Sequence, residues 1–530
     1  MHLLTRRQFT KVAALSPFVL GSALSRAQAD IGRLGGGAHE LTILYTNDFH
    51  SAFEPIPAYW LPGSPRLGGA AHLATLVEQE RTKAATSFLL DSGDMFTGTI
   101  SHLTHGEALM ELMTLMRYDA MSAGNHEFDY GWRIFDHAAT RVPFPILCCN
   151  IRYKGTGIRF TRPYTILERN GVRLGVIGVM GLNAARYTIM PSKVAELEFT
   201  DPVEEAKACV AELRETVDVL VVLGHQGLPG AMQTDAENDP EVQRPLNEDL
   251  AFCGNVPGID LYIAAHSHHG LEQAIVQPDT KTVITQTYGY GTRLGRIRLK
   301  VRDRKIVSHD IELLKVWSDQ LEPHAAVAAR HEHYRQVIAP EIGPVLSRTP
   351  VRLIRKYNHE SPLGALITDA MRAKTNADVA VTNSGGLRAD IPAGDIDRGR
   401  VLDVFPFLNE AVVVELAGAD LRGVLEHGLS LKAGISQVSG VRATYDLGRP
   451  IGHRLVSLEI GGAPVDDQRI YRVTTNSFLA EGGDGYASFK QGRIVGRDKQ
   501  LSDLMCDYVS QVPVVELPPM GRLVPVGGHA

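Results

Sequence analysis

Cysteine is scarce in this sequence, and long apolar runs are absent. The chain has 5 cysteines in 530 residues, a small and odd number that does not indicate a disulfide framework. Cys148 and Cys149 close the apolar run FPILCC, where we expect buried structural thiols. No uninterrupted apolar run reaches the roughly 18 to 20 residues that a membrane span needs, so we expect no stable membrane span.

A surplus of positive charge is also lacking. Lys and Arg number 54 against 60 Asp and Glu, which gives a net charge of −6, so the composition does not favour binding to nucleic acid. What is present is an ordinary globular composition, with 44% hydrophobic and 22% charged residues. A chain of 530 residues exceeds what one hydrophobic core usually supports, so two or more domains are expected.

The first 29 residues have the features of an export signal. Residues 5–11, TRRQFTK, form a twin-arginine pattern, residues 12–24 are mildly apolar, and residues 27–29, AQA, offer a small-x-small cleavage site. A basic N-terminus can arise by chance, but this combination predicts a Tat signal peptide over residues 1–29, with the Tat translocase as a partner during export. We therefore expect a periplasmic or extracellular protein that crosses the membrane already folded.

Four short apolar runs in the first half each end in polar residues. The runs are residues 41–46, 87–90, 217–223 and 259–265, and the residues that follow them are NDFH, DSGD, GHQG and HSHH. Runs this short and rich in Val, Ile and Leu, with helical stretches between some of them, predict buried strands of an α/β fold. Because ligands in such sheets bind beyond the carboxyl ends of the strands, these runs deliver Asp and His where a site is expected.

The stretch SAGNHEFDYG, residues 122–131, adds a fifth polar cluster between glycines. Taken alone it could be a surface turn, and GHQG and HSH could likewise be ordinary loop histidines. Together, however, the clusters supply two carboxylates, one amide and four imidazoles with no thiolate, a set that suits borderline or hard divalent ions. The candidate ligands of a two-metal site are Asp48, His50, Asp94, Asn125, His225, His266 and His268.

The second half of the chain has its own organisation. Residues 318–343 are alanine-rich, charged and without a strand-like run, with Pro323 and Pro340 near the ends, and they predict a partly helical connector. Strand-like runs resume after it. We therefore expect a signal peptide over residues 1–29, a first domain over 30–317, a helical linker over 318–345 and a second domain over 346–530.

In their order along the chain, these blocks resemble the calcineurin-like metallophosphoesterases, in the 5′-nucleotidase and UDP-sugar hydrolase branch. TNDFH, DSGDMFTG, SAGNHEFDYG, LGHQG and AAHSHH carry the resemblance in the first half, and ESPLGALITDAMR, NSGGLRADIPAGDI, DVFPFLNE and TNSFLAEGGDGY carry it in the second. The resemblance covers almost the whole mature chain. It implies an α/β protein with an N-terminal four-layer αββα metal domain and a smaller C-terminal mixed α/β substrate domain.

The resemblance also implies two divalent metal ions, with Mn, Zn or Co as the expected metals. One ion would be held by Asp48, His50, Asp94 and His268, and the other by Asp94, Asn125, His225 and His266, with Asp94 bridging them. His126 and Asp129 would form a catalytic dyad in which Asp129 orients the imidazole and favours its protonated form. His126 would then stabilise charge on the phosphoryl group or protonate the leaving oxygen. For Glu127 a structural role is expected.

In the second domain the resemblance implies a nucleotide site. Arg388 would hold a terminal phosphate, two phenylalanines would sandwich the base, and Asp484 would bind the ribose. The expected substrate-binding residues are Asn383, Arg388, Phe407, Asn409, Phe478 and Asp484. Without the motif context, both phenylalanines would be interpreted as core residues. Because the metal site lies in the other domain, we expect replacement of either phenylalanine to leave hydrolysis of a small phosphate ester nearly unchanged.

Two positions in the second domain depart from the family pattern. Tyr357 stands where many relatives have an arginine, and Arg355 or Lys356 could compensate for the missing cation. Leu408 replaces a glycine that is common before Asn409. The first change affects how the phosphate is bound, and the second affects the shape of the base pocket. Both therefore affect the preference among nucleotides.

These observations predict an exported, metal-dependent 5′-nucleotidase that acts on nucleoside 5′-monophosphates, with UDP-sugars and 2′,3′-cyclic nucleotides as further candidate substrates. One alternative is a sulfur-ester hydrolase of sulfur oxidation, which shares the fold and Tat export, but GNHEFD together with NSGGLR argues against it. Another alternative is a nucleotide-binding or adhesive surface protein without catalysis. The complete ligand set and the intact His126–Asp129 pair argue against that class.

Overall fold

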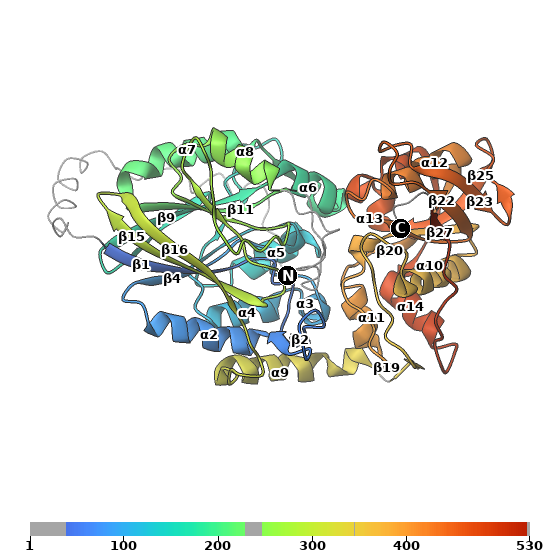
Figure 1. Cartoon of the computed structure of the whole chain (residues 1–530), viewed down its shortest axis with the longest axis horizontal. Helices are drawn as coiled ribbons and strands as arrows, with labels where there is room; N and C mark the ends of the chain where they lie inside the picture. Colours follow the sequence, from blue (N-terminus) through green and yellow to red (C-terminus); the bar gives the residue numbers. More distant parts are fainter. Residues whose placement is uncertain (1–38, 228–245, 344, 527–530) are drawn as a thin grey trace, which may run out of the picture.

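The chain folds into two domains that lie side by side and are joined by one long helix (Figure 1). The structure, a computed structural model, describes residues 39–227, 246–343 and 345–526. The predicted signal peptide, residues 1–29, lies outside the described residues. Within the described part of the chain, no helix combines the length and apolar character that crossing a membrane requires.

The first domain contains two six-stranded sheets, and the first of them has the strand order β16-β15-β1-β4-β5-β6. Its strands are β1 (His39–Thr46), β4 (Ser87–Asp91), β5 (Ala120–Ser122), β6 (Ile146–Leu147), β15 (Arg293–Arg302) and β16 (Lys305–Lys315). Neighbours from β1 to β6 run parallel, whereas β15 and β16 form an antiparallel hairpin beside β1. Residues 41–46 of β1 are all buried, because this part of the strand is covered on both faces of the sheet.

The second sheet of this domain has the strand order β13-β14-β12-β11-β9-β8. Its strands are β8 (Tyr164–Arg169), β9 (Val172–Met180), β11 (Val219–His225), β12 (Leu261–Ala264), β13 (Ile275–Val276) and β14 (Val283–Thr285). The four inner strands run parallel, and β8 and β13 pair antiparallel at the edges. Every residue of β11 is buried, as expected for a central parallel strand.

The two sheets pack face to face, with helices on both outer faces. Ile43 and Phe88 of the first sheet share one buried cluster with Val176 and Val221 of the second. The covering helices are α2 (Ala70–Thr82), α4 (Glu107–Leu115) and α5 (Trp132–Ala139) over the first sheet, and α7 (Pro202–Leu213) and α8 (Asn247–Asn255) over the second (Figure 1). The predicted four-layer αββα arrangement is therefore confirmed.

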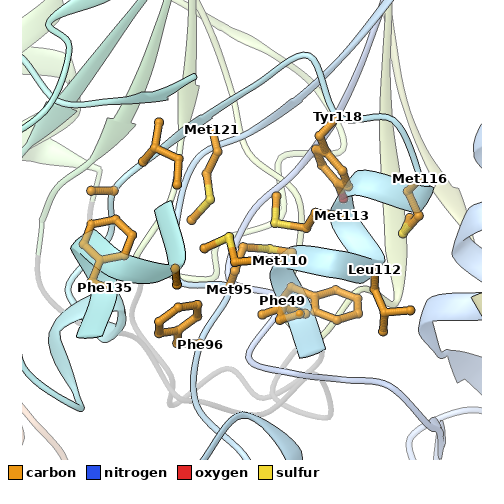
Figure 2. Packing of buried hydrophobic residues seen from close by; sticks show 14 of the residues in the cluster. Phe49, Met95, Phe96, Met110, Leu112, Met113, Met116, Tyr118, Met121 and Phe135 are labelled. Atoms are coloured by element: carbon orange, nitrogen blue, oxygen red, sulfur yellow. The ribbon is translucent and has the colours of Figure 1, made fainter. Parts of the chain in front are cut away.

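The core between the first sheet and its helices is rich in methionine (Figure 2). Five methionines are at most 6% exposed and pack with aromatic rings: Met95, Met110, Met113, Met116 and Met121. An unbranched thioether fills irregular gaps well. Met95 and its neighbour Phe96 anchor the loop after β4 in this cluster, directly behind the candidate ligand Asp94.

Helix α9 (Ala325–Ile342) lies within the expected connector. It packs against α2 and α4 along the outside of the first domain and ends beside the second domain (Figure 1). The His324 ring caps its first turn by accepting a hydrogen bond from the Val327 N–H at 3.3 Å. Pro340, expected near the end of the connector, lies inside the last turn of the helix, which ends at Ile342 before Gly343.

The second domain is a smaller mixed α/β unit, as predicted. One sheet has the order β21-β18-β25-β20-β26 and the other β24-β23-β22-β27. The strands are β18 (Val379–Asn383), β20 (Glu410–Ala417), β21 (Ser436–Ser439), β22 (Val441–Tyr445), β23 (Leu455–Ile460), β24 (Ala463–Pro464), β25 (Ile470–Asn476), β26 (Arg493–Gln500) and β27 (Leu523–Pro525). The helices packed against the sheets are α10 (Pro362–Thr375), α11 (Arg398–Val404), α12 (Gly418–Gly428) and α14 (Leu501–Val509).

The two domains meet along two seams. In one, α3 (Thr99–Thr104) faces α11, and Thr99 Oγ1 donates a hydrogen bond to Asp403 Oδ1 at 2.6 Å. In the other, Ser192 Oγ donates to Glu481 Oε2 at 3.1 Å, close to α6 (Leu182–Thr188). The candidate site lies between these seams.

Candidate functional site

All seven predicted metal ligands meet at the carboxyl ends of neighbouring strands. In the first sheet they follow the adjacent strands β1, β4 and β5, and in the second they end or follow β11 and β12. The strand ends of both sheets converge here, as expected for a ligand site in α/β layers. Each is at most 4% exposed: Asp48, His50, Asp94, Asn125, His225, His266 and His268.

The backbone at these ligands is unusual. Five of the seven have a positive φ, which side chains other than glycine rarely adopt: Asp48 (51°), His50 (47°), Asp94 (59°), His266 (72°) and His268 (52°). The loops are held by backbone bonds, since His50 N–H donates to the Asp94 carbonyl at 3.0 Å and Asp48 N–H donates to the Gly93 carbonyl at 2.9 Å. Strained conformations of this kind cluster at functional sites, where the surrounding structure stabilises them.

Asp48, His50 and His268 form the first group of facing ligand atoms. The Nε2 atoms of His50 and His268 lie 3.0 Å apart, and Asp48 Oδ1 lies 3.9 Å from the first and 3.4 Å from the second. The Asp48 carboxylate is fixed by the His266 N–H, which donates at 3.0 Å, and by the Asn47 amide, which donates at 2.6 Å. Two imidazole nitrogens and a carboxylate oxygen that converge on one point are typical ligands of a divalent ion.

Asp94, His225 and His266 form a second group, beside Asn125. His225 Nε2 lies 3.1 Å from Asp94 Oδ2 and 3.0 Å from Asn125 Oδ1. Its Nδ1–H donates to the Ser92 carbonyl at 2.9 Å, so Nε2 is left to face the group. An outer hydrogen bond of this kind fixes the tautomer of a metal-binding histidine.

Asp94 lies between the two groups, because two glycines let the neighbouring loops approach closely. It shares a further cluster with His50, a member of the first group. A Cβ at Gly124 would lie 2.3 Å from Asp94 Oδ1, and a Cβ at Gly93 would lie 2.6 Å from the Gly124 nitrogen. Side chains at these positions would displace the Asp94 loop, which explains the glycine at the start of the polar cluster over residues 122–131.

The donor set fits divalent metal ions. His266 Nε2 is buried and has no hydrogen-bond partner among the described residues, which is costly unless the nitrogen binds a ligand. Burial alone would raise the pKa of Asp94, but His225 and the other nearby histidines hold that pKa well below its ordinary value, so the carboxylate is ionised. Oxygen and imidazole donors without a thiolate suit ions such as Mn²⁺, Co²⁺ and Zn²⁺.

His126 and Asp129 are paired at the edge of the ligand cluster. His126 Nδ1 lies 3.0 Å from both Asp129 carboxylate oxygens, and Thr97 Oγ1 donates to Asp129 at 3.0 Å. His126 Nε2 faces Asp94, 4.0 Å from its Oδ2. Burial disfavours the charged imidazole, but the carboxylates of Asp129 and Asp94 outweigh it and raise the pKa of His126. The pair can therefore present a protonated Nε2 to a bound phosphoryl group.

Glu127 has a structural role, as expected, but the sequence did not indicate which groups it binds. Its buried carboxylate accepts four backbone N–H groups, from Gly124 at 2.6 Å, Met95 at 2.8 Å, Asp94 at 3.0 Å and Phe96 at 3.2 Å. These bonds tie the loop after β4 to the loop after β5, so Glu127 positions Asp94. An acidic residue in a glycine-flanked turn was the only signal, because backbone donors from a distant loop leave no sequence pattern.

A pocket opens beside the ligand cluster, between the two domains. It has about 860 Å³ of empty space, counted out to its open mouth. The first domain lines it with Asn125, His126, Phe128, Asp129, residues 188–190, Lys193 and His266, and the second with Tyr357, Asn383, Gly385, Gly386, Arg388, Phe407, Leu408, Asn409, Ala433, Phe478 and Asp484. All six predicted substrate-binding residues thus share one pocket with the predicted catalytic pair.

Polar groups in the second domain are preset for a ligand. Asn383 Nδ2 donates to Asp484 Oδ2 at 2.7 Å, and Asn476 Nδ2 orients Asn383 by donating to its Oδ1 at 3.1 Å. Burial raises the pKa of Asp484 to about 7, although Asn383 and Arg388 oppose the shift. The Arg388 side chain is buried, and its Nε and Nη2 have no hydrogen-bond partner among the described residues, so they can bind an anion.

Phe407 bridges the two halves of the site. Its ring stacks on His126, with centroids 5.7 Å apart and planes at 21°, and lies 5.8 Å from the Arg388 guanidinium carbon. This contact gives a reason to revise the expectation for Phe407, because a change at this ring can also alter the surroundings of His126. The motif identified the residue, but only the packing between domains shows what it contacts. Phe478 packs instead over Gly483, where a Cβ would lie 2.3 Å from its ring.

The two departures from the family pattern both lie in the pocket. Burial raises the pKa of Tyr357 well above its ordinary value, so its hydroxyl is neutral, and Leu408 lines the wall nearby. Arg355 does not replace the missing cation, because it donates to the Leu387 carbonyl at 3.1 Å and lines a different cleft. Among arginines of the described ranges, Arg388 alone lines the pocket.

Two family models match this chain. The calcineurin-like phosphoesterase model matches residues 41–270, and the 5′-nucleotidase C-terminal domain model matches residues 342–491. The two matches together cover more than two thirds of the chain, and each covers the larger part of one of the two domains that the structure shows.

Curated relatives share about three residues in ten with this chain. The trifunctional nucleotide phosphoesterase protein YfkN of Bacillus subtilis is 29% identical over 514 residues, and the alignment covers 86% of this chain but 33% of the relative. This chain therefore spans about a third of that relative's length. Snake venom 5′-nucleotidase of Naja atra is 29% identical over 549 residues, and the alignment covers 92% of this chain and 99% of the relative.

Solved structures share the fold across nearly the whole chain. The 5′-nucleotidase precursor from Thermus thermophilus superposes with a TM-score of 0.81 at 29% identity, covering 92% of this chain and 100% of the other. The sulfate thiohydrolase SoxB of Thermus thermophilus superposes with a TM-score of 0.76 at 20% identity, covering 92% and 97%. At 20% identity, the similarity to SoxB concerns the fold alone and does not support a sulfur-ester substrate.

The two family models match in chain order, and the part of the chain they cover holds the metal-ligand cluster, the His126–Asp129 pair and the pocket between the domains. This chain belongs to the calcineurin-like phosphoesterases that carry a 5′-nucleotidase C-terminal domain.

Proposed function

We propose that this protein is an exported phosphohydrolase that releases phosphate from nucleoside 5′-monophosphates. One observation carries the proposal: a single pocket is lined by the His126–Asp129 pair, by two aromatic rings of the second domain, and by Asn125 and His266 at the edge of the ligand cluster. A base can lie against the rings while its 5′-phosphate reaches the ligands. The likeness over 99% of the length of a relative named 5′-nucleotidase supports this substrate class.

Two divalent ions fit the cluster. Asp48, His50, Asp94 and His268 would hold one ion, and Asp94, Asn125, His225 and His266 the other, with Asp94 shared. Bound there, the ions would supply an activated water and offset the negative charge of the phosphoryl group.

The residues of the chain itself do the rest of the chemistry. Arg388 binds phosphoryl oxygens through its two free N–H groups and holds the phosphorus in line for attack by water. His126 donates the proton on Nε2 to the 5′-oxygen as the bond between phosphorus and that oxygen breaks. Asp129 stabilises the charged imidazole before the transfer. Phe407 and Phe478 hold the base, and Asp484 accepts hydrogen bonds from the ribose.

The proposal also includes the export route, further candidate substrates and the candidate metals. The twin-arginine pattern TRRQFTK supports export through the Tat pathway to the periplasm or the medium. UDP-sugars and 2′,3′-cyclic nucleotides are further candidate substrates, because each presents a nucleoside and a phosphorus to the same pocket. Mn, Zn and Co are the candidate metals.

A phosphate-release screen tests the proposed function. The mature protein, loaded with manganese, would be assayed on AMP and other mononucleotides, UDP-glucose, 2′,3′-cyclic AMP and a thiosulfate ester. Turnover should be fastest on a nucleoside 5′-monophosphate. Hydrolysis of the thiosulfate ester alone would overturn the proposal in favour of a sulfur-ester hydrolase, and binding of AMP without turnover of any ester would indicate a protein that has lost catalysis.

A further inference from the structure

A second and larger cleft reaches the ligand cluster from a different direction. It lies between the domains, with about 2290 Å³ of empty space counted out to solvent. His50 and Tyr290 line its inner end, whereas the substrate pocket reaches the cluster at Asn125 and His266. Arg388 lines both spaces, so this side chain separates them. A monoester bound with its base in the pocket has no group to place in the cleft.

The cleft carries an excess of positive charge. Six arginines line it against four carboxylates: Arg66, Arg335, Arg352, Arg355, Arg388 and Arg400 against Glu54, Asp390, Asp397 and Asp403. Arg352 and Arg355 form ion pairs with Asp390, and Arg335 Nη1 lies 3.6 Å from Glu54 Oε1. In contrast, the guanidinium groups of Arg66 and Arg400 form no ion pair within the described ranges of the chain. Unpaired cations in a cleft raise the local concentration of anions.

Buried polar groups at the inner end also lack partners. The hydroxyl of Tyr290 is buried and makes no hydrogen bond to any described residue, and its ring lies 5.3 Å from that of His50. Arg388 is 7% exposed, and its Nε and Nη2 are likewise unpartnered among those residues. Buried donors of this kind are normally satisfied, so the inner end is built to meet a ligand that accepts hydrogen bonds.

We propose that the cleft binds the second substituent of a phosphodiester substrate, and that this substituent is negatively charged. The inference rests on the proposed function, because it places the nucleoside in the aromatic pocket and the phosphorus at the ligand cluster. The second substituent then passes Tyr290 and Arg388 and lies among the arginines of the cleft. The protein would therefore accept anionic diesters of nucleoside 5′-phosphates in addition to the monoesters.

The position of His126 determines which bond of such a diester breaks. His126 lines the pocket and not the cleft, so its proton reaches the oxygen on the nucleoside side. Water adds to phosphorus, the bond from phosphorus to the nucleoside 5′-oxygen breaks, and a proton from the water replaces the one that His126 gives to that oxygen. The products are the free nucleoside and the phosphate monoester of the second substituent, which remains in the cleft until release.

Two matched diesters test this inference. Adenosine 5′-(2-sulfoethyl) phosphate and adenosine 5′-ethyl phosphate differ in one sulfonate charge on the second substituent. With the manganese-loaded protein, kcat/KM for the sulfoethyl ester should exceed that for the ethyl ester by about fivefold, and the products should be adenosine and the alkyl phosphate. Calorimetric titration of both diesters into the manganese-loaded His126→Ala protein, in which turnover should be slow, gives the same preference as a ratio of Kd values.

Charge reversal in the cleft should remove the preference. Arg400→Glu on the wall from the second domain and Arg66→Glu on the wall from the first should each bring the sulfoethyl-to-ethyl ratio to one or below. Arg442→Glu is the matched control, since Arg442 is an exposed arginine on β22 that lines neither space. This control should keep the wild-type ratio.

The outcomes separate the two proposals. Hydrolysis of AMP with no preference between the diesters, or with no binding of either, would overturn the cleft assignment and leave the proposed function intact. Absence of AMP hydrolysis would overturn the proposed function, and the Kd ratio would still decide whether the cleft selects an anion. Retention of the preference in both cleft variants would show that the selecting charge lies elsewhere and would overturn the assignment.

Discussion

The proposed metal-binding side and the proposed nucleotide-binding side of this site are held in place by different means. On the metal side, every ligand follows or ends a buried strand and is at most 4% exposed, and five of them have a left-handed backbone. On the nucleotide side, Phe407 and Phe478 are both partly exposed at the domain boundary, Phe407 on the loop between α11 and β20 and Phe478 on the short helix α13 (Ser477–Ala480). Under the proposed function, one domain alone would hold the metal ligands and the proton donor, whereas the choice of substrate would depend on how the two domains meet.

Contacts between the domains fix the nucleotide side. The His102 Nδ1–H donates to the Pro406 carbonyl at 3.1 Å, directly before Phe407. Farther out, the Arg352 guanidinium carbon lies 3.9 Å from the centroid of the Tyr59 ring, a cation–π contact across the boundary. Because Phe407 also stacks on His126, a change in the angle between the domains alters both the base pocket and the surroundings of the catalytic imidazole.

Loss of the shared carboxylate should give the largest effect, and it lies wholly on the metal side. Asp94→Asn should lower turnover by more than the roughly 10² to 10⁴-fold expected for an acid–base residue, because one side chain serves both ions. Metal analysis should show depletion of both sites, with partial recovery in excess manganese. Two tightly bound metals per chain in this variant would contradict the bridging role of Asp94.

Loss of the proton donor should give the next largest effect and should leave the metals in place. His126→Ala should reduce kcat on AMP by roughly 10² to 10⁴-fold while the metal content stays at the wild-type level. Asp129→Asn, which keeps a hydrogen bond and removes the charge, should give a smaller loss. A His126→Ala protein with kcat near the wild-type value would show that another group donates the proton.

Replacing the two phenylalanines one at a time tests whether each ring acts on the nucleotide side alone. Phe478→Ala should lower kcat/KM for AMP by roughly 5- to 150-fold and should spare 4-nitrophenyl phosphate, which cannot fill the base pocket. Phe407→Ala should lower activity on both substrates, because its ring also packs on His126. Equal losses on both substrates for Phe478→Ala would assign that ring to the fold rather than to the base.

The smallest expected effect is a pH dependence on the nucleotide side. Burial raises the pKa of Asp484 to about 7, so the carboxyl is neutral below that pH and ionised above it. The ionised form is the better acceptor for ribose hydroxyls, and KM for AMP relative to 4-nitrophenyl phosphate should rise about two- to fivefold from pH 8 to pH 6. The Asp484→Asn variant, measured in the same way, gives the part of the change that comes from titration of the two phosphates. The rise in the wild type should exceed that in Asp484→Asn, and an equal rise in both proteins would exclude this role.

The metal side could be predicted from the sequence because strand ends leave a pattern. Asp48-x-His50 and His266-x-His268 directly follow buried apolar runs, and parallel strands bring such positions to one edge of a sheet. The same runs indicate buried strands of an α/β fold, whereas the four-layer arrangement was implied by the resemblance to the family. These strands pack against one another within the first domain, so contacts with the second domain do not determine their arrangement.

The remaining features could not be read from the sequence, because they depend on contacts between distant segments. Glu127 acts through backbone N–H groups of another loop, and Phe407 acts partly through a ring in the other domain. Motifs identified Phe407 as a base-binding candidate but gave no sign of its contact with His126. The arginine-lined cleft likewise exists only where the two domains face each other.

One measurement tests the central claim on both sides at once. A crystal of the mature protein soaked in manganese and a non-hydrolysable AMP analogue would be measured at the manganese absorption edge. We predict two anomalous peaks that share Asp94, one beside Asp48, His50 and His268 and the other beside Asn125, His225 and His266, with the base between Phe407 and Phe478. A single peak, or a base bound away from both rings, would contradict the account.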